Sequence, residues 1–569
     1  MKKAVIEFKN FTWQYNAQKE PTLRGIDLTV FEGEKVLICG PSGCVKSTLA
    51  HCLNGLIPFS YRGEMSGSLR LFGRETRGLS LFEISKLVGT VLQDSDGQFV
   101  GLTVAEDIAF ALENDAVPQQ ELFRRVYEAA GQVELLDHLS HAPNELSGGQ
   151  KQRVSIAGVM VDHVPVLLFD EPLANLDPAT GKQAVELIDE IHNRTQTTVI
   201  IIEHRLEDVL HRDVDRVILM EDGRIAADTT PDELLASDIL RNHGIREPLY
   251  ITALKHAGVR LSPDMGLHNI QSLRLNEEQR ETVCRWFHKT PAAPESPQSE
   301  PLLVAEHIRF SYDNGFEALR DISLTIRKGE MLAIVGGNGA GKSTFSKVVC
   351  GFERQCEGSL AFRGLDLTQL SIKERADHIG YVMQNPNQMI SKVQIFDEVA
   401  LGLVTRGVEE GERQERVEEA LRICGLHPFR KWPVSALSYG QKKRVTIASI
   451  LALDPEMIIL DEPTAGQDYR RYTEIMEFLR ELNGRGVTVV IITHDMHLML
   501  EYCRRAVVFA DGRKIADARP SDILTDSEVV ERASLRETSL YELAVRCGVE
   551  DPRAFVQRFI DFDREARNR

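Results

Sequence analysis

The residues of this chain with the most definite chemistry lie in a glycine-rich segment near its middle. Residues 336–343 read GGNGAGKS after an apolar run and fit the pattern G-x-x-x-x-G-K-[ST] in full. In loops of this kind, backbone N–H groups surround phosphate oxygens, the lysine neutralises their charge and the hydroxyl holds Mg²⁺. We therefore expect Lys342 to bind the β- and γ-phosphates of ATP and Ser343 to bind the metal.

A second segment, residues 40–47, reads GPSGCVKS and departs from this pattern at one position. Val45 replaces the last glycine, where the backbone approaches the phosphates closely. A β-branched side chain there should crowd the nucleotide or strain the loop. Lys46, Ser47 and Thr48 remain, so we expect a site that binds ATP weakly or has lost binding. The alternative is that Val45 is a variant without consequence.

Two apolar runs end in an aspartate followed by a glutamate, in LLFDEP and IILDEP. We expect Asp170 and Asp461 to bind Mg²⁺ through water, and Glu171 and Glu462 to polarise the water that attacks ATP. Alone, such a run is more often an ordinary strand end. Its place downstream of a phosphate loop favours the catalytic interpretation.

Two pairs of polar residues follow other apolar runs. His204 and His494 occupy matched places, so we predict a contact with the γ-phosphate, although an isolated histidine there is usually structural. Gln93 and Gln384 are predicted to touch Mg²⁺ and the attacking water.

Two tyrosines lie upstream of the loops. Tyr15 and Tyr312 end strands of alternating apolar and polar residues, and each either stacks on adenine or packs in its strand.

These landmarks form an internal repeat. Lys46 recurs as Lys342 after 296 residues, and Asp170 recurs as Asp461 after 291. Within each copy, buried strands alternate with helices, which predicts an α/β fold with a parallel sheet covered on both faces.

The composition is that of a globular protein with a net charge of −18 over 569 residues. An acidic chain is a poor candidate for non-specific nucleic-acid binding, and any membrane attachment should go through a protein partner. Its apolar runs are far shorter than the roughly 20 residues of a membrane span. The scattered cysteines lack a CxxC pair, which favours a reducing compartment over zinc or disulfide use.

The segments LSGGQKQRV and LSYGQKKRV complete the motif set. Together with the loops and carboxylates, they identify the chain as resembling the ABC ATPase superfamily over nearly its whole length. Segments 93–114 and 384–403 resemble energy-coupling factor (ECF) ATPases of cobalt and vitamin importers. Segments 51–58, 244–255 and 438–449 are similar to fused bacterial ABC transporter ATP-binding proteins.

The resemblance implies two tandem nucleotide-binding domains, each with a parallel sheet core, a helical subdomain and an antiparallel β subdomain. It implies ATP and Mg²⁺ as cofactors. The implied partners are an integral membrane coupling protein and a small substrate-binding membrane protein, which would hold the chain peripherally on the cytoplasmic side of the cell membrane. The transported solute is not implied.

The resemblance also implies head-to-tail pairing, with each ATP between the loop of one half and the signature of the other. The Val45 loop would then face LSYGQ, where Tyr439 replaces a glycine, giving one consensus and one degenerate site. The alternative is that Tyr439 is a tolerated variant. The implied signature residues are Ser147, Gly148, Gly149, Gln150, Ser438, Tyr439, Gly440 and Gln441.

The residues expected to contact ATP lie in both loops and upstream of them. They are Tyr15, Gly40, Pro41, Ser42, Gly43, Cys44, Val45, Lys46, Ser47 and Thr48, with Tyr312, Gly336, Gly337, Asn338, Gly339, Ala340, Gly341, Lys342, Ser343 and Thr344. The predicted metal ligands are Ser47, Asp170, Ser343 and Asp461.

The chain is expected to divide into ATPase domains at 1–245 and 302–535, a helical appendage with a Pro-rich linker at 246–301, and a helical tail at 536–569. The main alternative function is a tandem ABC protein acting on ribosomes or nucleic acid, which the acidic charge disfavours. A sugar importer's fused ATPase would usually carry its degenerate loop in the second half. A DNA-repair protein would need zinc cysteines or a coiled-coil insertion, which the sequence lacks.

Overall fold

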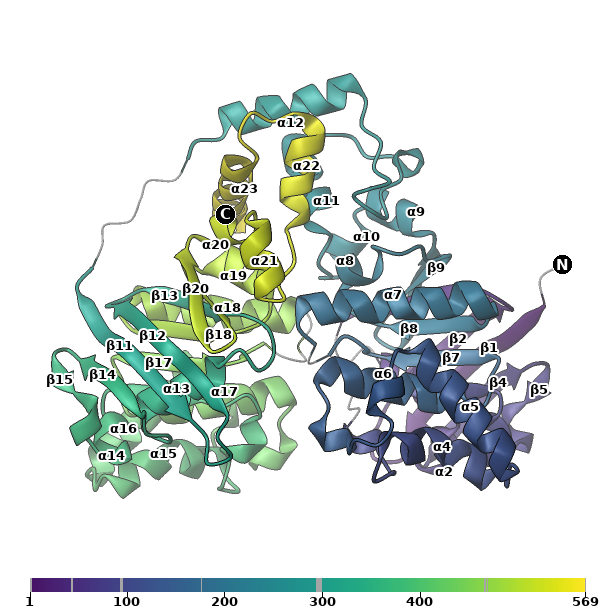
Figure 1. Ribbon diagram of the computed structural model, residues 1–569, viewed down its shortest axis with the longest axis horizontal. Coiled ribbons are helices and arrows are strands. Elements are labelled where there is room, and N and C mark those ends of the chain that lie inside the picture. Colours follow the sequence, from purple (N-terminus) through teal and green to yellow (C-terminus); the bar gives the residue numbers. More distant parts are fainter. Residues whose placement is uncertain are drawn as a thin grey trace. The chain divides into compact units, whose positions relative to one another are not determined.

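The computed structural model describes residues 3–41, 45–92, 96–174, 176–292, 299–464, 467 and 469–567. It divides the chain into two compact units, residues 1–285 and 286–569. The two units repeat the same order of elements, coloured purple to teal in the first and teal to yellow in the second (Figure 1). The predicted fold class is confirmed, whereas the finer division into four segments stays a prediction.

The first unit is built on a six-stranded sheet of order β10-β9-β3-β8-β7-β6, in which only the β9–β10 pair is antiparallel. Its central strands are buried at every position, as expected for parallel strands covered on both faces. The strands are β3 (Lys35–Cys39), β6 (Val88–Val91), β7 (Val166–Asp170), β8 (Thr198–Ile202), β9 (Arg216–Glu221) and β10 (Arg224–Thr229).

An antiparallel sheet of order β2-β1-β4-β5 accompanies it. The apolar residues of both sheets and of the first helix form one core cluster, which includes Trp13, Leu49 and Leu168. The strands are β1 (Ala4–Tyr15), β2 (Leu23–Phe31), β4 (Gly63–Leu71) and β5 (Arg74–Glu75). The main helices are α1 (Lys46–Leu53), α4 (Val104–Asn114), α5 (Gln119–Gln132), α6 (Gly148–Met160) and α7 (Pro178–Thr195).

The second unit repeats this architecture, with sheet orders β16-β17-β18-β13-β19-β20 and β12-β11-β14-β15. Its larger sheet contains β13 (Met331–Val335), β16 (Ile379–Val382), β17 (Met457–Asp461), β18 (Thr488–Ile492), β19 (Arg505–Ala510) and β20 (Arg513–Ala518). Its smaller sheet contains β11 (Pro301–Ser311), β12 (Glu317–Arg327), β14 (Glu357–Phe362) and β15 (Leu365–Asp366). The main helices are α13 (Lys342–Cys350), α15 (Ile395–Thr405), α16 (Glu410–Ile423), α17 (Tyr439–Leu451), α18 (Tyr469–Gly484) and α19 (Met496–Tyr502).

Each repeat is followed by helices that the sequence also indicates. The first is followed by α11 (Leu249–Ala257) and α12 (Glu277–Lys289), and the second by α22 (Ser539–Cys547) and α23 (Pro552–Arg567). In the second unit, the guanidinium of Arg564 on α23 donates to main-chain carbonyls at the end of α19. Helix α23 is thereby attached to the sheet-and-helix core of its own unit.

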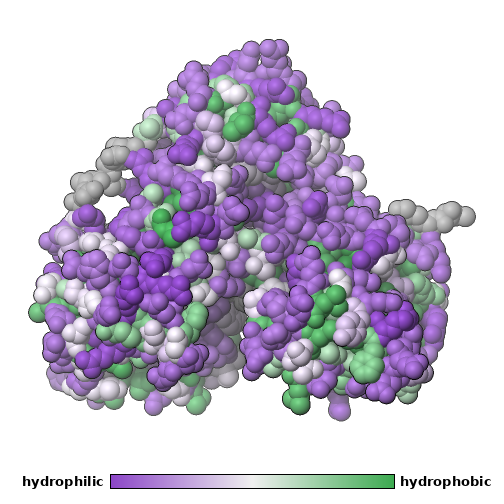
Figure 2. Space-filling view, viewed as in Figure 1, coloured by the Kyte–Doolittle hydropathy of each residue, from purple (hydrophilic) through white to green (hydrophobic). Residues whose placement is uncertain are grey.

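The described residues include no helix long and apolar enough to cross a membrane. The face shown in Figure 2 is mostly hydrophilic, with apolar side chains in small groups.

Candidate active site

The loop of the second unit connects β13 to α13. Gly341 adopts the left-handed conformation, with φ 97°, immediately before the helix starts at Lys342. The Lys342 ammonium is buried and donates to the carbonyl oxygens of Gly336 and Gly337, at 2.8 Å each. A cation is thus held beside a helix N-terminus, where backbone N–H groups favour phosphate.

The loop of the first unit has the same lysine arrangement. Lys46 Nζ donates to the carbonyl oxygens of Gly40 at 2.8 Å and Pro41 at 3.2 Å. The predicted contacts Ser42, Gly43 and Cys44 lie outside the described residues.

Val45 occupies the place of Gly341 and takes the same left-handed conformation, with φ 72° and ψ 28°. For a β-branched residue this conformation is strained by roughly 1–2 kcal/mol. The side chain packs against the core cluster of its unit. In this structure, therefore, the departure from glycine appears as backbone strain beside the loop.

Gly341 shows why glycine suits this position. A Cβ atom built there would lie 2.7 Å from the carbonyl oxygen of Ala318 and 3.0 Å from a methyl group of Leu319. The second unit has no room for the side chain that the first unit accommodates.

The two predicted metal-binding pairs come together. Asp170 ends β7 and Asp461 ends β17, and they accept hydrogen bonds from Ser47 and Ser343 respectively. The Oδ1 atom of Asp170 is buried and has no hydrogen-bond partner among the described residues. A hydroxyl beside a carboxylate oxygen with unused acceptor capacity fits a hard cation such as Mg²⁺.

The described residues contain no cluster of three His, Cys, Asp or Glu side chains suited to a metal. Mg²⁺ usually keeps several waters and binds one or two carboxylates beside phosphate oxygens, so it does not need such a cluster. Burial, with the nearby charges of Glu171 and Glu203, raises the pKa of Asp170 to about 6. In the second unit, Tyr381 donates a hydrogen bond to Asp461 at 3.1 Å.

The two predicted catalytic glutamates follow these aspartates and share an unusual backbone. Glu171 has φ 50° and Glu462 has φ 47°. Each main-chain N–H donates at 2.9 Å to the last residue of the adjacent strand, Ile202 or Ile492. Non-glycine residues in this conformation are strained, and such residues cluster at functional sites. The sheet edge thus fixes both glutamates beside the loops.

The predicted histidines lie near these glutamates but are held differently. In the second unit, His494 Nδ1 is 2.8 Å from Glu462 Oε1. In the first unit, His204 Nδ1 is 4.0 Å from Glu171 Oε1 and 3.0 Å from Oε1 of Glu203. Glu203 was not among the residues predicted from sequence. Its signal was a charged residue in IIEHR where the second copy has threonine, in IITHD.

A buried lysine joins three of the second unit's motifs. Lys443 Nζ donates to the carbonyl oxygens of Gln384 at 2.7 Å, Met383 at 3.1 Å and Glu462 at 3.3 Å. Burial lowers the pKa of Lys443 to about 8. The main chain of the predicted residue Gln384 thus lies beside that of Glu462, the predicted catalytic residue. Its counterpart Gln93 lies outside the described residues.

The signature segments begin α6 and α17. Ser147 and Ser438 are the N-caps, and each exchanges hydrogen bonds with the glutamine three residues later, Gln150 or Gln441. These capping boxes satisfy two N–H groups at the helix start.

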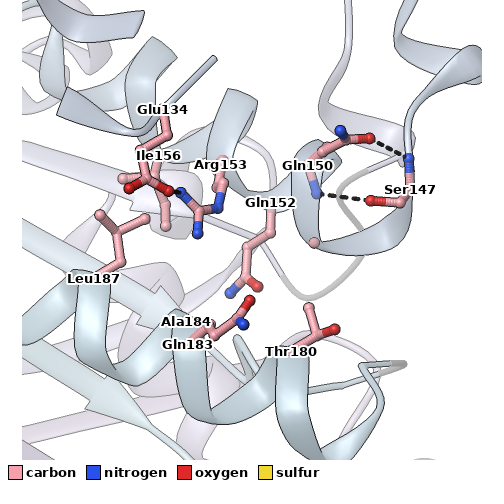
Figure 3. Close-up of a pocket in the computed structure, with 11 residues that line it drawn as sticks. Glu134, Ser147, Gln150, Gln152, Arg153, Ile156, Thr180, Gln183, Ala184 and Leu187 are labelled. Atoms are coloured by element: carbon pink, nitrogen blue, oxygen red, sulfur yellow. Dashed lines mark hydrogen bonds and ion pairs between the residues drawn. The ribbon is translucent and has the colours of Figure 1, made fainter. Parts of the chain in front are cut away.

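A cavity of 280 Å³ lies beside the first signature, between α6 and α7 (Figure 3). Its lining includes Gln150, Gln152 and Thr180, and Arg153, which donates to Glu134 at 2.6 Å. The signature therefore opens onto a polar cavity within its own unit.

The glycines of the signatures have different requirements. A Cβ at Gly149 would lie 2.5 Å from Cγ2 of Thr180, whereas one at Gly148 would meet nothing closer than 3.7 Å. Tyr439 takes the place of Gly148, and its hydroxyl donates to the carbonyl oxygen of Gln384 at 3.3 Å. Gly440 follows it, where a Cβ would come within 3.1 Å of Gln467 Oε1. The position of Tyr439 thus tolerates a side chain.

The two predicted adenine-stacking tyrosines contact the loop helices through their hydroxyl groups. Tyr15 lies 3.2 Å from Oγ1 of Thr48, and Tyr312 lies 3.0 Å from Oγ1 of Thr344. Both rings also pack against the core cluster of their unit, so both interpretations of these tyrosines stay open.

Comparison with known proteins agrees with this geometry. The family model for the ABC transporter matches residues 23–174 and 319–465. The chain belongs to the ABC transporter ATP-binding family. It is therefore an ATPase with two ABC domains, as the sequence analysis predicted. A second model, for an ATP-binding cassette cobalt transporter, matches residues 237–310.

Full-length relatives support the same assignment of this ABC ATPase. A protein of Clostridium perfringens named "Putative ABC transporter ATP-binding protein" is 59% identical, with 100% of both chains covered. A protein of the same name from Enterococcus faecalis is 57% identical, also over 100% of both chains. Among solved structures, cbiO1 of Clostridium perfringens, part of the ABC transporter complex cbiONQ, is 34% identical. That match covers 42% of this chain and 96% of cbiO1, with a TM-score of 0.39.

Proposed function

We propose that this ABC ATPase supplies energy for solute import through membrane proteins that are separate chains, as in ECF transporters. The observation that carries the proposal is the repeated set of a loop lysine, an Asp–Glu pair and a histidine at the carboxyl ends of parallel strands in both units. The matched cobalt-transporter model adds support for a transporter of this class.

We assign the residues of the second unit the following roles. Lys342 binds the β- and γ-phosphates, and Ser343 with Asp461 holds Mg²⁺, which neutralises phosphate charge when bound. Glu462 accepts a proton from the attacking water, and His494, held by Glu462, contacts the γ-phosphate. Lys46, Ser47, Asp170, Glu171 and His204 are the corresponding set in the first unit.

We further propose that the two sites differ in strength. The site of the first unit carries a β-branched residue in the left-handed conformation beside its lysine, whereas the site of the second unit has glycine. This strain supports weaker nucleotide binding by the first loop. Tyr439 in the second signature is the other departure at this proposed site, and its side chain is accommodated within its own unit.

Exposed apolar side chains near the Gln93 and Gln384 segments support docking on a membrane protein. Leu102 is 82% exposed and Val100 is 61% exposed in the first unit, and Val393 is 73% exposed in the second. We propose that these side chains contact the integral membrane coupling protein, with the chain on the cytoplasmic face of the membrane.

The experiment is to purify the chain with its co-expressed membrane partner, to reconstitute the complex in liposomes, and to measure ATP turnover and solute uptake. Glu462→Gln should abolish coupled uptake, and Glu171→Gln should reduce it less. Leu102→Asp and Val393→Asp should release the membrane partner while leaving ATP binding unchanged. ATP turnover without any solute movement into the compartment that holds the ATPase would refute the import proposal.

A further inference from the structure

Glu203 is a fully buried carboxylate that none of the assigned roles uses. It follows the last residue of β8, a central strand of the sheet, and has 0% exposure. An unpaired buried charge would be strongly destabilising, so its partners indicate why it is kept.

Those partners all belong to the active-site edge of the first unit. Glu203 accepts hydrogen bonds from the backbone N–H groups of His204 at 2.8 Å, Arg205 at 3.2 Å and Leu173 at 3.3 Å. Its Oε1 atom also lies 3.0 Å from His204 Nδ1. Burial opposes ionisation, yet His204 and Arg205 hold the pKa of Glu203 down at about 2. It is therefore a charged group paired with the histidine.

The second unit offers an internal comparison at the same position. Thr493 is also fully buried, and its hydroxyl donates to Oε2 of Glu462 at 3.3 Å. With threonine there, His494 bonds to the catalytic Glu462 through both its backbone N–H, at 3.0 Å, and its ring Nδ1, at 2.8 Å. The neutral residue thus leaves the catalytic glutamate as the partner of the histidine.

We propose that Glu203 is a positioning residue that holds His204 in place of the catalytic glutamate, so that the two sites of this ATPase orient their histidines by different carboxylates. With Nδ1 paired to Glu203, the Nε2 atom of His204 is the nitrogen left to face a phosphate. The inference rests on the proposed role of this histidine as a γ-phosphate contact.

The same pairing favours the protonated, positively charged form of His204. Burial opposes this, but the charges of Glu203 and, more weakly, Glu171 raise the pKa of His204, while Arg205 acts against them. The charge of Lys46 also acts on Glu171. The first loop, weakened by Val45, would thus gain a persistent positive charge directed at its nucleotide.

The test measures ATP affinity with a fluorescent ATP analogue, using the full chain in a Lys342→Ala background so that the first site reports alone. Glu203→Thr introduces the residue that the second unit has at this position, and His204 should then pair with Glu171. We expect affinity at pH 7.5 to fall about tenfold, and the pH at which affinity is half lost to move down. Glu203→Gln, which keeps the shape, should give an intermediate change.

The matched control is Thr493→Glu in a Lys46→Ala background, which should move the half-loss pH of the second site upward. A purely structural role would not produce shifts of opposite sign. If Glu203→Thr does not fold, Glu203→Gln and Thr493→Glu decide the matter. Unchanged affinity and pH dependence in these variants, or no binding to the first site at all, would overturn the inference. Failure of transport with these shifts intact would instead count against the proposed transporter function.

Discussion

Replacing Gly341 by valine is the sharpest test of how the two phosphate loops differ. The change would place in the second unit the residue that the first unit carries. A β-branched residue at φ 97° is strained by roughly 1–2 kcal/mol. Its Cβ would also lie 2.7 Å from the Ala318 carbonyl oxygen, a backbone atom that cannot move freely. Forcing such a contact typically adds about 1–3 kcal/mol.

We therefore expect Gly341→Val to lower the free energy of unfolding by about 3 kcal/mol and to displace the loop that holds Lys342. Nucleotide affinity of the second site, measured in a Lys46→Ala background, should fall at least a hundredfold. Gly341→Ala carries the Cβ atom without the branch. Its nucleotide affinity should lie between those of the wild type and Gly341→Val.

The reciprocal change, Val45→Gly, is the control. It relieves roughly 1–2 kcal/mol of strain but loses part of the packing of a half-buried valine, about 1 kcal/mol, and adds about 0.5–1 kcal/mol of chain entropy. Stability measured by urea unfolding should thus change by less than about 1 kcal/mol. The reasoning is refuted if Gly341→Val keeps its affinity within threefold, or if both swaps destabilise equally.

Three further predictions concern other parts of the site. Because burial holds the folded pKa of Lys443 at about 8, against 10.5 ordinarily, the unfolded chain binds more protons above pH 8. The unfolding free energy of wild type relative to Lys443→Gln should then rise by about 3 kcal/mol between pH 8 and 10.5, and a flat difference in urea titrations would contradict this. Gly149→Ala should destabilise the protein by about 1–3 kcal/mol, with rescue by Thr180→Ser, whereas Gly148→Ala should be neutral in the same thermal melts. Because the pKa of Asp170 is raised to about 6, Mg²⁺-dependent ATP binding by the first site should weaken as pH falls through 6, in titrations with and without Mg²⁺; constant affinity from pH 5 to 7.5 would count against it.

Much of this site was predictable because its motifs are local. Gly-rich loops, strand-end aspartates and helix caps are specified by a few consecutive residues, so the places of Lys342 and Asp461 follow from the sequence. The direction of a side chain is a different matter. Val45 was expected to crowd the nucleotide or strain its loop, and the structure has its backbone strained and its side chain against the core.

The contacts that sequence analysis missed depend on which of several nearby groups a side chain reaches. His204 has two carboxylates within reach, and no spacing rule chooses between Glu171 and Glu203. Lys443 is one of three consecutive cations near the start of α17, and its role becomes visible only when the carbonyl oxygens of Gln384 and Glu462 surround it. Such choices are made by tertiary packing.

The attachment of the last long helix to the second ATPase unit has a mechanical consequence. Arg564 holds the end of α19, and α19 starts two residues after His494. At the other end of α23, Phe555 packs against Trp286 and Phe287 of the segment that precedes the repeat. A force applied to this segment, or a molecule bound to it, would therefore act through α23 and α19 on the neighbourhood of His494. A protein fused to the chain's carboxyl end should be joined to α23 by a long flexible linker, so that it exerts no force on α23.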